Sequence, residues 1–351
     1  MESTEYLIVG SGLAGMTLAH TLEKQGLRFK IIAKPELSKC SQVAAGIYNP
    51  VVFYRITKSY MADAVLPFAL SFYGNIELKL MQKLLYPHPV AKIFANENES
   101  QLWEKRREEG VGHYLGEHVP FVGDIDRLNS AFGFGLVNQT GSLDCETFLS
   151  ASLEYFKPYW LNETFQYADL KHNHDGVEYH DIEAKNVIFC EGHLIANNPF
   201  FNAIELKPVK GEILIVEFED DLPTEEQELI LNKKCYLLPI ENRQYIVGAT
   251  YNWNTLNDEI STEGLEELSK NIREITQIKF KVLRQTAGVR PASADRRPII
   301  GMHPSHPSLF LFNGLGTKGV MLAPYYANEL LQLMTLNQQP HKEVSIARYL
   351  K

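Results

Sequence analysis

A glycine-rich turn between an apolar strand and an amphipathic helix constrains this chain more than any other feature of its sequence. The turn follows the apolar run at residues 6–9 and matches the pattern G-x-G-x-x-G in Gly10-Ser11-Gly12-Leu13-Ala14-Gly15. Apolar residues then recur at helical spacing as far as Gly26, and residues 29–32 supply a second strand. This context predicts a βαβ unit that binds a dinucleotide.

Each glycine of the turn has its own expected task. Gly10 permits the tight turn, Gly12 lets a pyrophosphate approach the backbone, and Gly15 allows close contact between helix and strand. The helix N-terminus offers free N–H groups to the phosphates. The acid that usually ends the second strand is absent, because Ala33 and Lys34 occupy that place. We expect the adenosine ribose to be held by main chain and serines, or by Glu36 reaching back from beyond a proline.

The remaining elements predict an α/β fold in which two domains interleave. Helices are expected over residues 61–85, 99–109, 261–275 and 323–334, with another that Asp144 caps; strands are expected over residues 186–190, 211–218, 236–239, 244–248 and 309–312. A Rossmann-like domain would combine residues 1–85, 140–205 and 285–351. A smaller mixed, β-rich substrate domain would combine residues 86–139 and 206–284.

Charge and cysteine content narrow the class of protein. The 43 acidic residues outnumber the 34 basic ones and give a formal net charge of −9, which disfavours non-specific attachment to nucleic acid. The four cysteines form no C-x-x-C pair, and neither a signal peptide nor a membrane-spanning run is evident. We therefore expect a reduced cytoplasmic protein without a membrane contact. The histidine pairs lack a third ligand at suitable spacing, so no metal site is predicted. The oligomeric state stays open.

A second group of small residues follows the first βαβ unit. It runs from residue 38 to residue 46 and includes Ser41, Ala44, Ala45 and Gly46. Small side chains here would let a large cofactor pass close to the backbone. The composition is equally typical of a flexible loop.

The third group of motifs lies near the end of the chain and carries a resemblance. It comprises Gly288-Val289-Arg290-Pro291, then Asp295-Arg296-Arg297-Pro298-Ile299-Ile300-Gly301, then Asn313-Gly314-Leu315-Gly316-Thr317-Lys318-Gly319. Together with Cys190-Glu191-Gly192, these motifs resemble the D-amino-acid oxidase and glycine oxidase superfamily of FAD-dependent oxidoreductases. Within it, the chain is most similar to the oxidoreductase half of the bifunctional tRNA 5-methylaminomethyl-2-thiouridine biosynthesis proteins, through the run Ala45-Gly46-Ile47-Tyr48-Asn49-Pro50 and residues 314–319. Because the dinucleotide fold starts at residue 6, no methyltransferase half is expected before it.

The resemblance implies the cofactor, the reaction and the site residues. Relatives transfer a hydride from the carbon next to nitrogen to the flavin, and the imine is then hydrolysed. Arg290 matches the arginine that binds the substrate carboxylate; the alternative is a structural ion pair with Asp295. Lys318 and Thr317 would lie beside the flavin, although Lys318 could equally be a solvated surface residue. Tyr48, Tyr54 and Tyr251 are candidates for the substrate pocket.

The same resemblance implies non-covalent FAD, because Gly288 stands where some relatives carry a linking cysteine. The expected cofactor contacts are Gly10, Ser11, Gly12, Leu13, Ala14, Gly15, Ala33, Lys34, Ser41, Ala44, Ala45, Gly46, Cys190, Gly192, Gly288, Arg290, Gly314, Gly316, Thr317, Lys318 and Gly319.

Three hypotheses on function remain at this point. The leading one is oxidation of a small amine or amino acid, of the glycine or N-substituted glycine type. The second is flavin-dependent removal of a carboxymethyl group from a wobble uridine in tRNA, which would need a basic surface around the pocket. The third is a flavin-binding protein without turnover, or a nicotinamide-linked reductase. A missing pocket, or an Arg290 held in an ion pair, would favour a protein without turnover.

Overall fold

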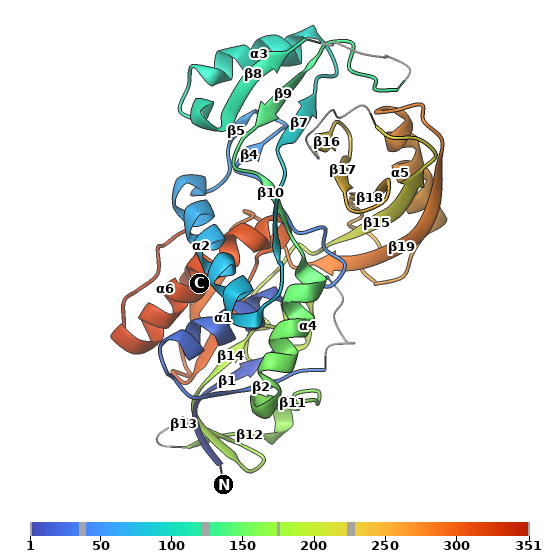
Figure 1. Cartoon of the computed structure of the whole chain (residues 1–351). Coiled ribbons are helices and arrows are strands. Elements are labelled where there is room, and N and C mark those ends of the chain that lie inside the picture. The colour runs from blue at the N-terminus through green and yellow to red at the C-terminus, as the bar shows by residue number, and fades with distance from the viewer. Residues whose placement is uncertain (1, 35–39, 121–126, 174–175, 223–228, 350–351) are drawn as a thin grey trace.

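The βαβ unit forms the centre of a largely parallel sheet (Figure 1). The computed structural model describes residues 2–34, 40–120, 127–173, 176–222 and 229–349. In this sheet β1 (Glu2–Val9) lies between β2 (Phe29–Ile32) and β14 (Ile182–Phe189), and α1 (Leu13–Lys24) connects β1 to β2. β11 (Trp160–Leu161) and β21 (Leu309–Asn313) extend the parallel sheet on either side. β20 (Ile299–Met302) pairs antiparallel with β21, and the hairpin of β12 (Leu170–Asn173) and β13 (Gly176–Tyr179) pairs with β14.

Both faces of this sheet are buried where the strands are apolar, at the carboxyl-terminal halves of β1 and β14. Tyr6 and Ile8 of β1 belong to the core that the sheet forms with α1, α2 (Ala62–Leu80), α4 (Cys145–Tyr155) and α6 (Gly319–Leu336). Leu7 and Val9 point to the opposite face and pack in a second core with Phe189. Figure 1 shows the four helices gathered on one side of the sheet. We call this part of the molecule the first lobe.

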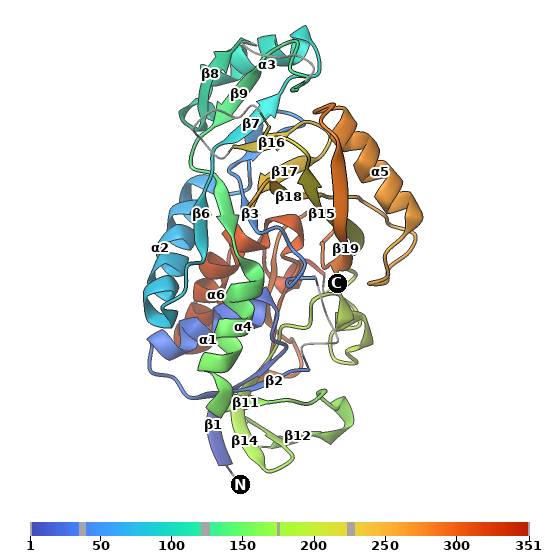
Figure 2. The same ribbon diagram turned by 45° about the vertical axis from the view of Figure 1, so that its right-hand side comes forward.

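A second lobe is built on one long, mixed sheet. Its eight strands follow the order β19 (Phe280–Arg290), β15 (Val209–Phe218), β18 (Gln244–Gly248), β17 (Tyr236–Pro239), β16 (Ile230–Asn232), β7 (Val90–Ile93), β9 (Phe134–Val137) and β8 (Leu115–Val119). Figure 2 shows α5 (Thr262–Arg273) beside β15 and β19, and α3 (Glu97–Arg107) beside β8 and β9. Segments on either side of the α4 region of the chain thus meet in one sheet, through the parallel pairing of β16 with β7.

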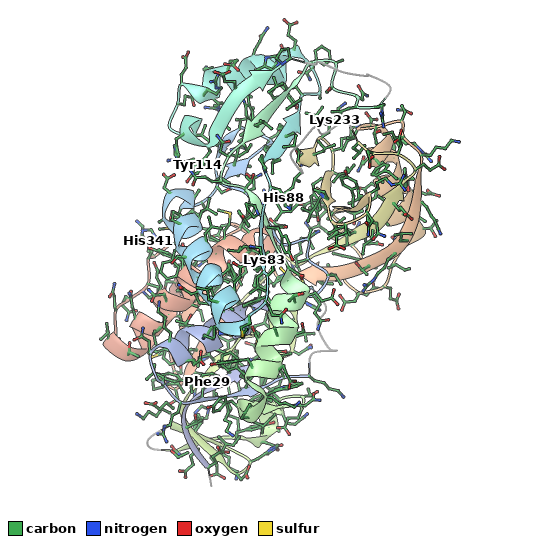
Figure 3. The ribbon with its side chains drawn as sticks, viewed as in Figure 1. Phe29, Lys83, His88, Tyr114, Lys233 and His341 are labelled. Atoms are coloured by element: carbon green, nitrogen blue, oxygen red, sulfur yellow. The ribbon has the colours of Figure 1, made fainter. Side chains whose placement is uncertain are left out.

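Short strands connect the two lobes. β10 (Gly141–Leu143) pairs with both β3 (Ile47–Tyr48) and β6 (Leu85–Pro87), and β4 (Val51–Val52) pairs with β5 (Thr57–Lys58). His88, labelled in Figure 3, follows β6 in this connection, and its backbone N–H donates to Thr140 O at 3.2 Å. β6 spans the boundary expected between residues 85 and 86, and β19 spans the one expected at residue 285. Two of the expected boundaries thus fall inside strands, and the division into two discontinuous domains stays a proposal.

Most predicted elements lie close to the expected residues, and the larger differences are at the start of one strand and at helix ends. The strand predicted over residues 186–190 begins four residues earlier, at Ile182, and ends at Phe189. The helix predicted over residues 61–85 ends at Leu80, because Met81 adopts a left-handed conformation with φ of 53°. The last helix begins at Gly319 instead of residue 323. Its first turn, Val320-Met321-Leu322, is buried and uniformly apolar, so no helical periodicity marks the start. In the described ranges, no helix combines the length and apolarity that crossing a membrane requires.

Candidate active site

A large cavity lined by both lobes gathers most of the residues predicted to contact a cofactor. Its volume is about 1250 Å³, beyond the roughly 300–1,000 Å³ usual for a drug-sized ligand. It is therefore large enough for a dinucleotide together with a small substrate. The predicted residues that line it are Gly10, Ser11, Gly12, Leu13, Ala14, Ala33, Lys34, Ser41, Ala44, Ala45, Gly46, Cys190, Gly192, Tyr251, Gly288, Arg290, Gly316, Thr317, Lys318 and Gly319.

The glycine turn after β1 forms part of the cavity wall. Gly10 has φ of +109°, and a Cβ there would lie 2.5 Å from Cys190 O. A Cβ on Gly15 would lie 1.9 Å from Gly10 O, so Gly15 serves the contact of helix and strand and does not itself line the cavity. A Cβ on Gly12 would meet only Ser41 Oγ, at 3.4 Å. Gly12 thus opens onto the cavity, while Gly10 and Gly15 set the backbone around it.

The first turn of α1 fits a phosphate group. Among the described residues, no side chain caps the helix at Gly12, and its first turn holds no acidic residue. Leu13 N donates to Ser41 Oγ at 3.2 Å, which ties the small-residue segment to the helix end. Gly46 closes that segment with φ of +68°, where a Cβ would lie 1.8 Å from Leu143 O. The free N–H groups and the positive end of the helix dipole suit a pyrophosphate.

The part of the cavity expected to hold the adenosine lacks the acidic residue that usually ends the second strand. Ala33 follows the end of β2 and lines the cavity, and Glu36 lies outside the described residues. The neighbouring strand β11 runs parallel to β2, and Ala33 N donates to Leu161 O at 3.1 Å. Glu163 follows β11 and lines the cavity. A carboxylate is thus present beside the end of β2, but it comes from the adjacent strand, and the sequence interpretation missed it.

Replacing Glu163 by glutamine is expected to weaken FAD binding by roughly 10- to 100-fold, because a hydrogen bond to a charged group contributes about 1.5–3 kcal/mol. The measurement is a titration of apoprotein with FAD, followed by flavin fluorescence. Glu154→Gln is the matched control, since Glu154 lies at the end of α4 with 74% of its side chain exposed and does not line the cavity. Equal dissociation constants for Glu163→Gln and wild type would contradict a ribose contact.

A second carboxylate, that of Glu191, lies just after β14. Glu191 accepts hydrogen bonds from the Tyr167 hydroxyl at 2.5 Å and from Asn198 Nδ2 at 2.8 Å. Burial raises the pKa of Glu191 to about 7, although both hydrogen bonds oppose the shift. The next residue, Gly192, accepts a hydrogen bond through its carbonyl oxygen from Asn313 Nδ2 at 2.8 Å. This network joins the segment after β14 to the end of β21, beside the cavity.

Arg290 is the last residue of β19 and lines the cavity. Its Nη1 donates to Thr250 O at 3.2 Å, and its guanidinium lies 4.9 Å from the centre of the Tyr251 ring. Asp295 pairs with Arg348 instead, at 3.3 Å between Oδ2 and Nε. Among the described residues, no carboxylate lies within 4.0 Å of the Arg290 guanidinium. The structural ion pair considered as its alternative role is therefore not formed with Asp295.

A glycine on the neighbouring strand makes room for this guanidinium. A Cβ on Gly211 of β15 would lie 1.8 Å from Nη2 and 2.2 Å from Cζ of Arg290. Tyr236 of β17 lines the same region, and burial raises the pKa of its phenol above the usual range. A cationic fork with free donors, set among apolar and aromatic side chains, is suited to grip a carboxylate with two hydrogen bonds.

Lys318 reaches the cavity from the short turn before α6. Its Nζ donates to Asn49 O at 2.7 Å. Burial lowers the pKa of Lys318 to about 8, so the ammonium form is lost at mildly alkaline pH. Lys318 is therefore not the solvated surface lysine that the sequence left open.

A change in the charge of Lys318 should appear in the reduction potential of the bound cofactor. Lys318→Met is expected to lower the midpoint potential by roughly 30 mV or more below pH 8, since ~30 mV corresponds to about 1.4 kcal/mol for two electrons. The difference from wild type should shrink above pH 8, because the wild-type ammonium is then deprotonated. Spectroelectrochemistry from pH 6 to pH 10 measures both effects. A difference that does not vary with pH would contradict the lowered pKa of Lys318.

The predicted tyrosines have different locations. Tyr251 lines the cavity, but Tyr48 and Tyr54 are not among its lining residues. Tyr48 is buried in β3, where a Cβ on Gly141 would lie 2.3 Å from its hydroxyl oxygen, and burial raises its pKa to about 12. Tyr54 is 89% exposed. Gly314, also predicted to contact the cofactor, is not a lining residue either; it turns with φ of +74° against Ile299.

Further residues line the cavity although no motif identified them in that role, and four of them bear on its chemistry. They are Glu163, Gly211, Tyr236 and Trp253. Gly211 stands in the predicted strand at residues 211–218, but strand pairing alone brings it beside Arg290. A pattern of isolated glycines in apolar strands is the one sequence signal that marks such close approaches. In the described part of the chain, no group of three or more His, Cys, Asp or Glu residues has the arrangement of a metal site.

Comparison with protein families gives one match that covers most of the chain. Residues 5–333 match the family described as FAD dependent oxidoreductase. Glycine oxidase of Bacillus subtilis (strain 168) is 28% identical over 169 residues, which are 46% of this chain and 44% of that protein. The tRNA 5-methylaminomethyl-2-thiouridine biosynthesis bifunctional protein of Acinetobacter baylyi is 25% identical over 342 residues, 91% of this chain and 51% of that protein. The chain thus spans about half the length of these curated relatives.

Solved structures show the same fold along the whole chain. Glycine oxidase from Geobacillus kaustophilus superposes with a TM-score of 0.82 at 18% identity, and all of each chain is covered. Iminodiacetate oxidase from Chelativorans sp. BNC1 gives a TM-score of 0.77 at 18% identity, covering 97% of this chain and 98% of that one. The predicted α/β architecture with a Rossmann-like dinucleotide-binding lobe is therefore confirmed.

Proposed function

The chain belongs to the FAD-dependent oxidoreductase family, and from this premise we propose that it oxidises the carbon–nitrogen bond of a small amine or amino acid of the glycine or N-substituted glycine type. FAD supplies the acceptor for the two electrons and the hydrogen removed from the carbon next to nitrogen. We further propose that FAD is bound without a covalent link, since Gly288 lies where a linking cysteine would be needed. The chain's own residues bind and orient the substrate.

One observation carries this proposal. The Arg290 guanidinium faces the cavity with no carboxylate partner among the described residues. A substrate carboxylate would accept two charge-assisted hydrogen bonds from this guanidinium. That contact would hold the adjacent carbon in a defined place, which is the main task of the protein in such a reaction. The names of two similar proteins, glycine oxidase and iminodiacetate oxidase, describe substrates with a glycine unit, which supports this class.

The cavity also bears on the hypothesis of a flavin-binding protein without turnover. Under that hypothesis, either the substrate pocket would be missing or the Arg290 guanidinium would be paired with a carboxylate of the protein. Arg290 instead lines a cavity of about 1250 Å³ together with Tyr236 and Tyr251. The geometry therefore favours an enzyme.

A second candidate function is the oxidation of a carboxymethylated amine on a tRNA wobble uridine. Its support is the alignment with the tRNA biosynthesis proteins, which reaches 91% of this chain with the relative from Acinetobacter baylyi. Arg290 would take the carboxymethyl group in the same way as a free glycine unit. The net charge of −9 favours the small substrate, because binding to tRNA relies on a basic surface.

The test is an absorbance spectrum of the purified holoprotein, followed by anaerobic additions of glycine, sarcosine, D-amino acids and other N-substituted glycines. Bleaching of the flavin band by one of them is the expected result. A flavin band that only a carboxymethylaminomethyl-modified tRNA bleaches would assign the second function. A flavin band that nothing bleaches would contradict both candidate functions.

A further inference from the structure

We propose that the loop at residues 250–261 holds a recognition site for a planar ring, so that the substrate is a glycine-type amine whose nitrogen carries an aromatic substituent. This inference rests on the proposed function and names its substrate class. It follows from an exposed aromatic pair, from the position of that pair beside Arg290, and from the rigid anchoring of the loop.

The aromatic pair is Tyr251 and Trp253. Their ring centres lie 6.0 Å apart with an angle of 26° between the planes, which is a stacked arrangement. Tyr251 is 52% exposed and Trp253 is 62% exposed. Large exposed apolar side chains next to one another often mark a binding surface, because they gain little from water and are stabilised when covered.

The pair lies at the same cavity as Arg290. Tyr251, Trp253 and Arg290 all line it, and the Arg290 guanidinium lies 4.9 Å from the centre of the Tyr251 ring. A substrate carboxylate bound to the Arg290 guanidinium would therefore lie close to the stacked rings. A substrate with a carboxylate at one end and a ring on its nitrogen can contact both groups at once.

The loop that carries the pair is tied to β15 by its backbone. Lys210 N donates to Asn252 O at 2.9 Å, and Asn252 N donates back to Lys210 O at 3.0 Å. The Asn252 side chain then accepts from Asn254 N at 2.8 Å and from Thr255 N at 3.0 Å. Tyr251 and Trp253 flank this doubly bonded residue, so their backbone positions are fixed.

A buried ion pair anchors the far end of the loop. Lys210 and Glu212 have 3% of their side chains exposed, and their charged groups are 3.6 Å apart. Lys210 Nζ also donates to Asn257 Oδ1 at 3.0 Å. Glu212 accepts from Ser261 N at 2.9 Å and from Ser261 Oγ at 2.6 Å, where α5 begins. Because folding already orders this loop, binding a ring costs little further conformational entropy.

Charge near the loop indicates which ring-bearing ligand fits. Asp258 and Glu259 belong to the same loop and would repel the phosphates of a polynucleotide. A neutral aromatic substituent meets no such repulsion. These two carboxylates of the loop therefore favour a small N-arylalkyl glycine over a nucleic acid.

The test compares N-benzylglycine with sarcosine and with N-(cyclohexylmethyl)glycine, which has similar bulk but no planar ring. Dissociation constants are measured by anaerobic calorimetry on the holoenzyme, and flavin bleaching is recorded in parallel. We expect the holoenzyme to bind N-benzylglycine more tightly than either other ligand. Trp253→Ala should lower that preference about tenfold, which corresponds to about 1.4 kcal/mol, and Trp253→Phe should restore most of it.

The control variant is Tyr159→Ala, because Tyr159 is an exposed aromatic residue, at 48%, that does not line the cavity. It should leave the preference unchanged. Equal binding of the three glycines, or a preference that Trp253→Ala does not alter, would overturn the ring site. A dimer that dissociates on Trp253→Ala would overturn it as well, since the pair would then contact a second copy of the chain. Binding decides this inference and bleaching decides the proposed function, so the two can fail separately.

Discussion

Replacing Arg290 by glutamine is expected to lower kcat/KM for a glycine-type substrate by two to three orders of magnitude while FAD stays bound. Removing one partner of a desolvated charge pair costs about 2–5 kcal/mol, and each ~1.4 kcal/mol is a factor of ten. The loss should be large here because the guanidinium has no carboxylate partner of its own in the described part of the chain. Steady-state kinetics with the substrate identified by flavin bleaching gives the measurement.

Two variants show whether the effect belongs to the guanidinium fork. Arg290→Lys keeps the positive charge but loses the paired donors, so it should recover only part of the activity. Arg284→Gln removes an exposed arginine from the same strand and should leave kcat/KM unchanged. If Arg290→Gln retains wild-type kcat/KM, the carboxylate is bound elsewhere.

Gly211→Ala offers an independent route to the same conclusion. The added Cβ would lie 1.8 Å from Arg290 Nη2, and the guanidinium is the mobile end of a long side chain. We therefore expect the protein to fold and Arg290 to move. KM should rise more than kcat falls, while the thermal midpoint stays near that of wild type.

The second large effect is expected at the glycine turn, where two neighbouring substitutions should act differently. Gly10→Ala forces an alanine to a φ of +109° and brings a Cβ within 2.5 Å of Cys190 O. Unfavourable backbone conformations cost about 1–3 kcal/mol and overpacking about 1–3 kcal/mol. The apoprotein should lose stability by roughly 2–6 kcal/mol, and FAD binding should be lost with it.

Gly12→Ala should separate cofactor binding from folding. Its Cβ would meet only Ser41 Oγ, at 3.4 Å, but would enter the cavity wall where the pyrophosphate is expected. Apoprotein stability should fall by no more than about 1 kcal/mol, since alanine is less favourable than glycine at the N-cap of α1, while the dissociation constant for FAD rises by at least tenfold. Chemical unfolding of the apoproteins and FAD titration measure the two quantities.

Gly74→Ala serves as the control for both glycine variants. Gly74 lies in α2, and nothing is within 4 Å of a Cβ built there. An alanine in a helix should stabilise the protein by about 0.5–1 kcal/mol, without changing FAD affinity. If Gly12→Ala also leaves FAD affinity unchanged, the turn does not approach the pyrophosphate.

Local patterns predicted the bounds of several secondary-structure elements well. β2 and β18 begin and end at the residues that the sequence indicated, and Asp144 caps α4 by accepting from Thr147 N at 2.9 Å. Such features depend on a few consecutive residues, so their physics is visible in the sequence. Helix ends were less predictable. The residue with left-handed backbone at the end of α2 is Met81, so no glycine marks that end in the sequence. The first turn of α6 is buried and shows no helical periodicity.

The substrate end of the cavity could not be read from the sequence in the same way. Gly211 and Arg290 approach one another because β15 pairs with β19, and Glu163 reaches the end of β2 because β11 pairs with β2. Tyr48 was a candidate from its motif, yet it packs against β10 and does not line the cavity. These placements depend on strand register, and the sequence of one strand does not show which residues of another strand pair with it.

The sequence by itself determined the dinucleotide fold, since the glycine turn has only one suitable context, between a buried strand and a helix. Through the resemblance carried by its motif, the sequence also predicted a place for Arg290 at the substrate, and Arg290 does line the cavity. Only the tertiary structure decided which groups share that cavity. Lys318 meets Asn49 across 269 residues of chain, and Tyr251 and Trp253 meet Arg290 through a loop anchored on a buried ion pair. Contacts over such distances form when the two lobes pack, so their partners are set by the whole fold.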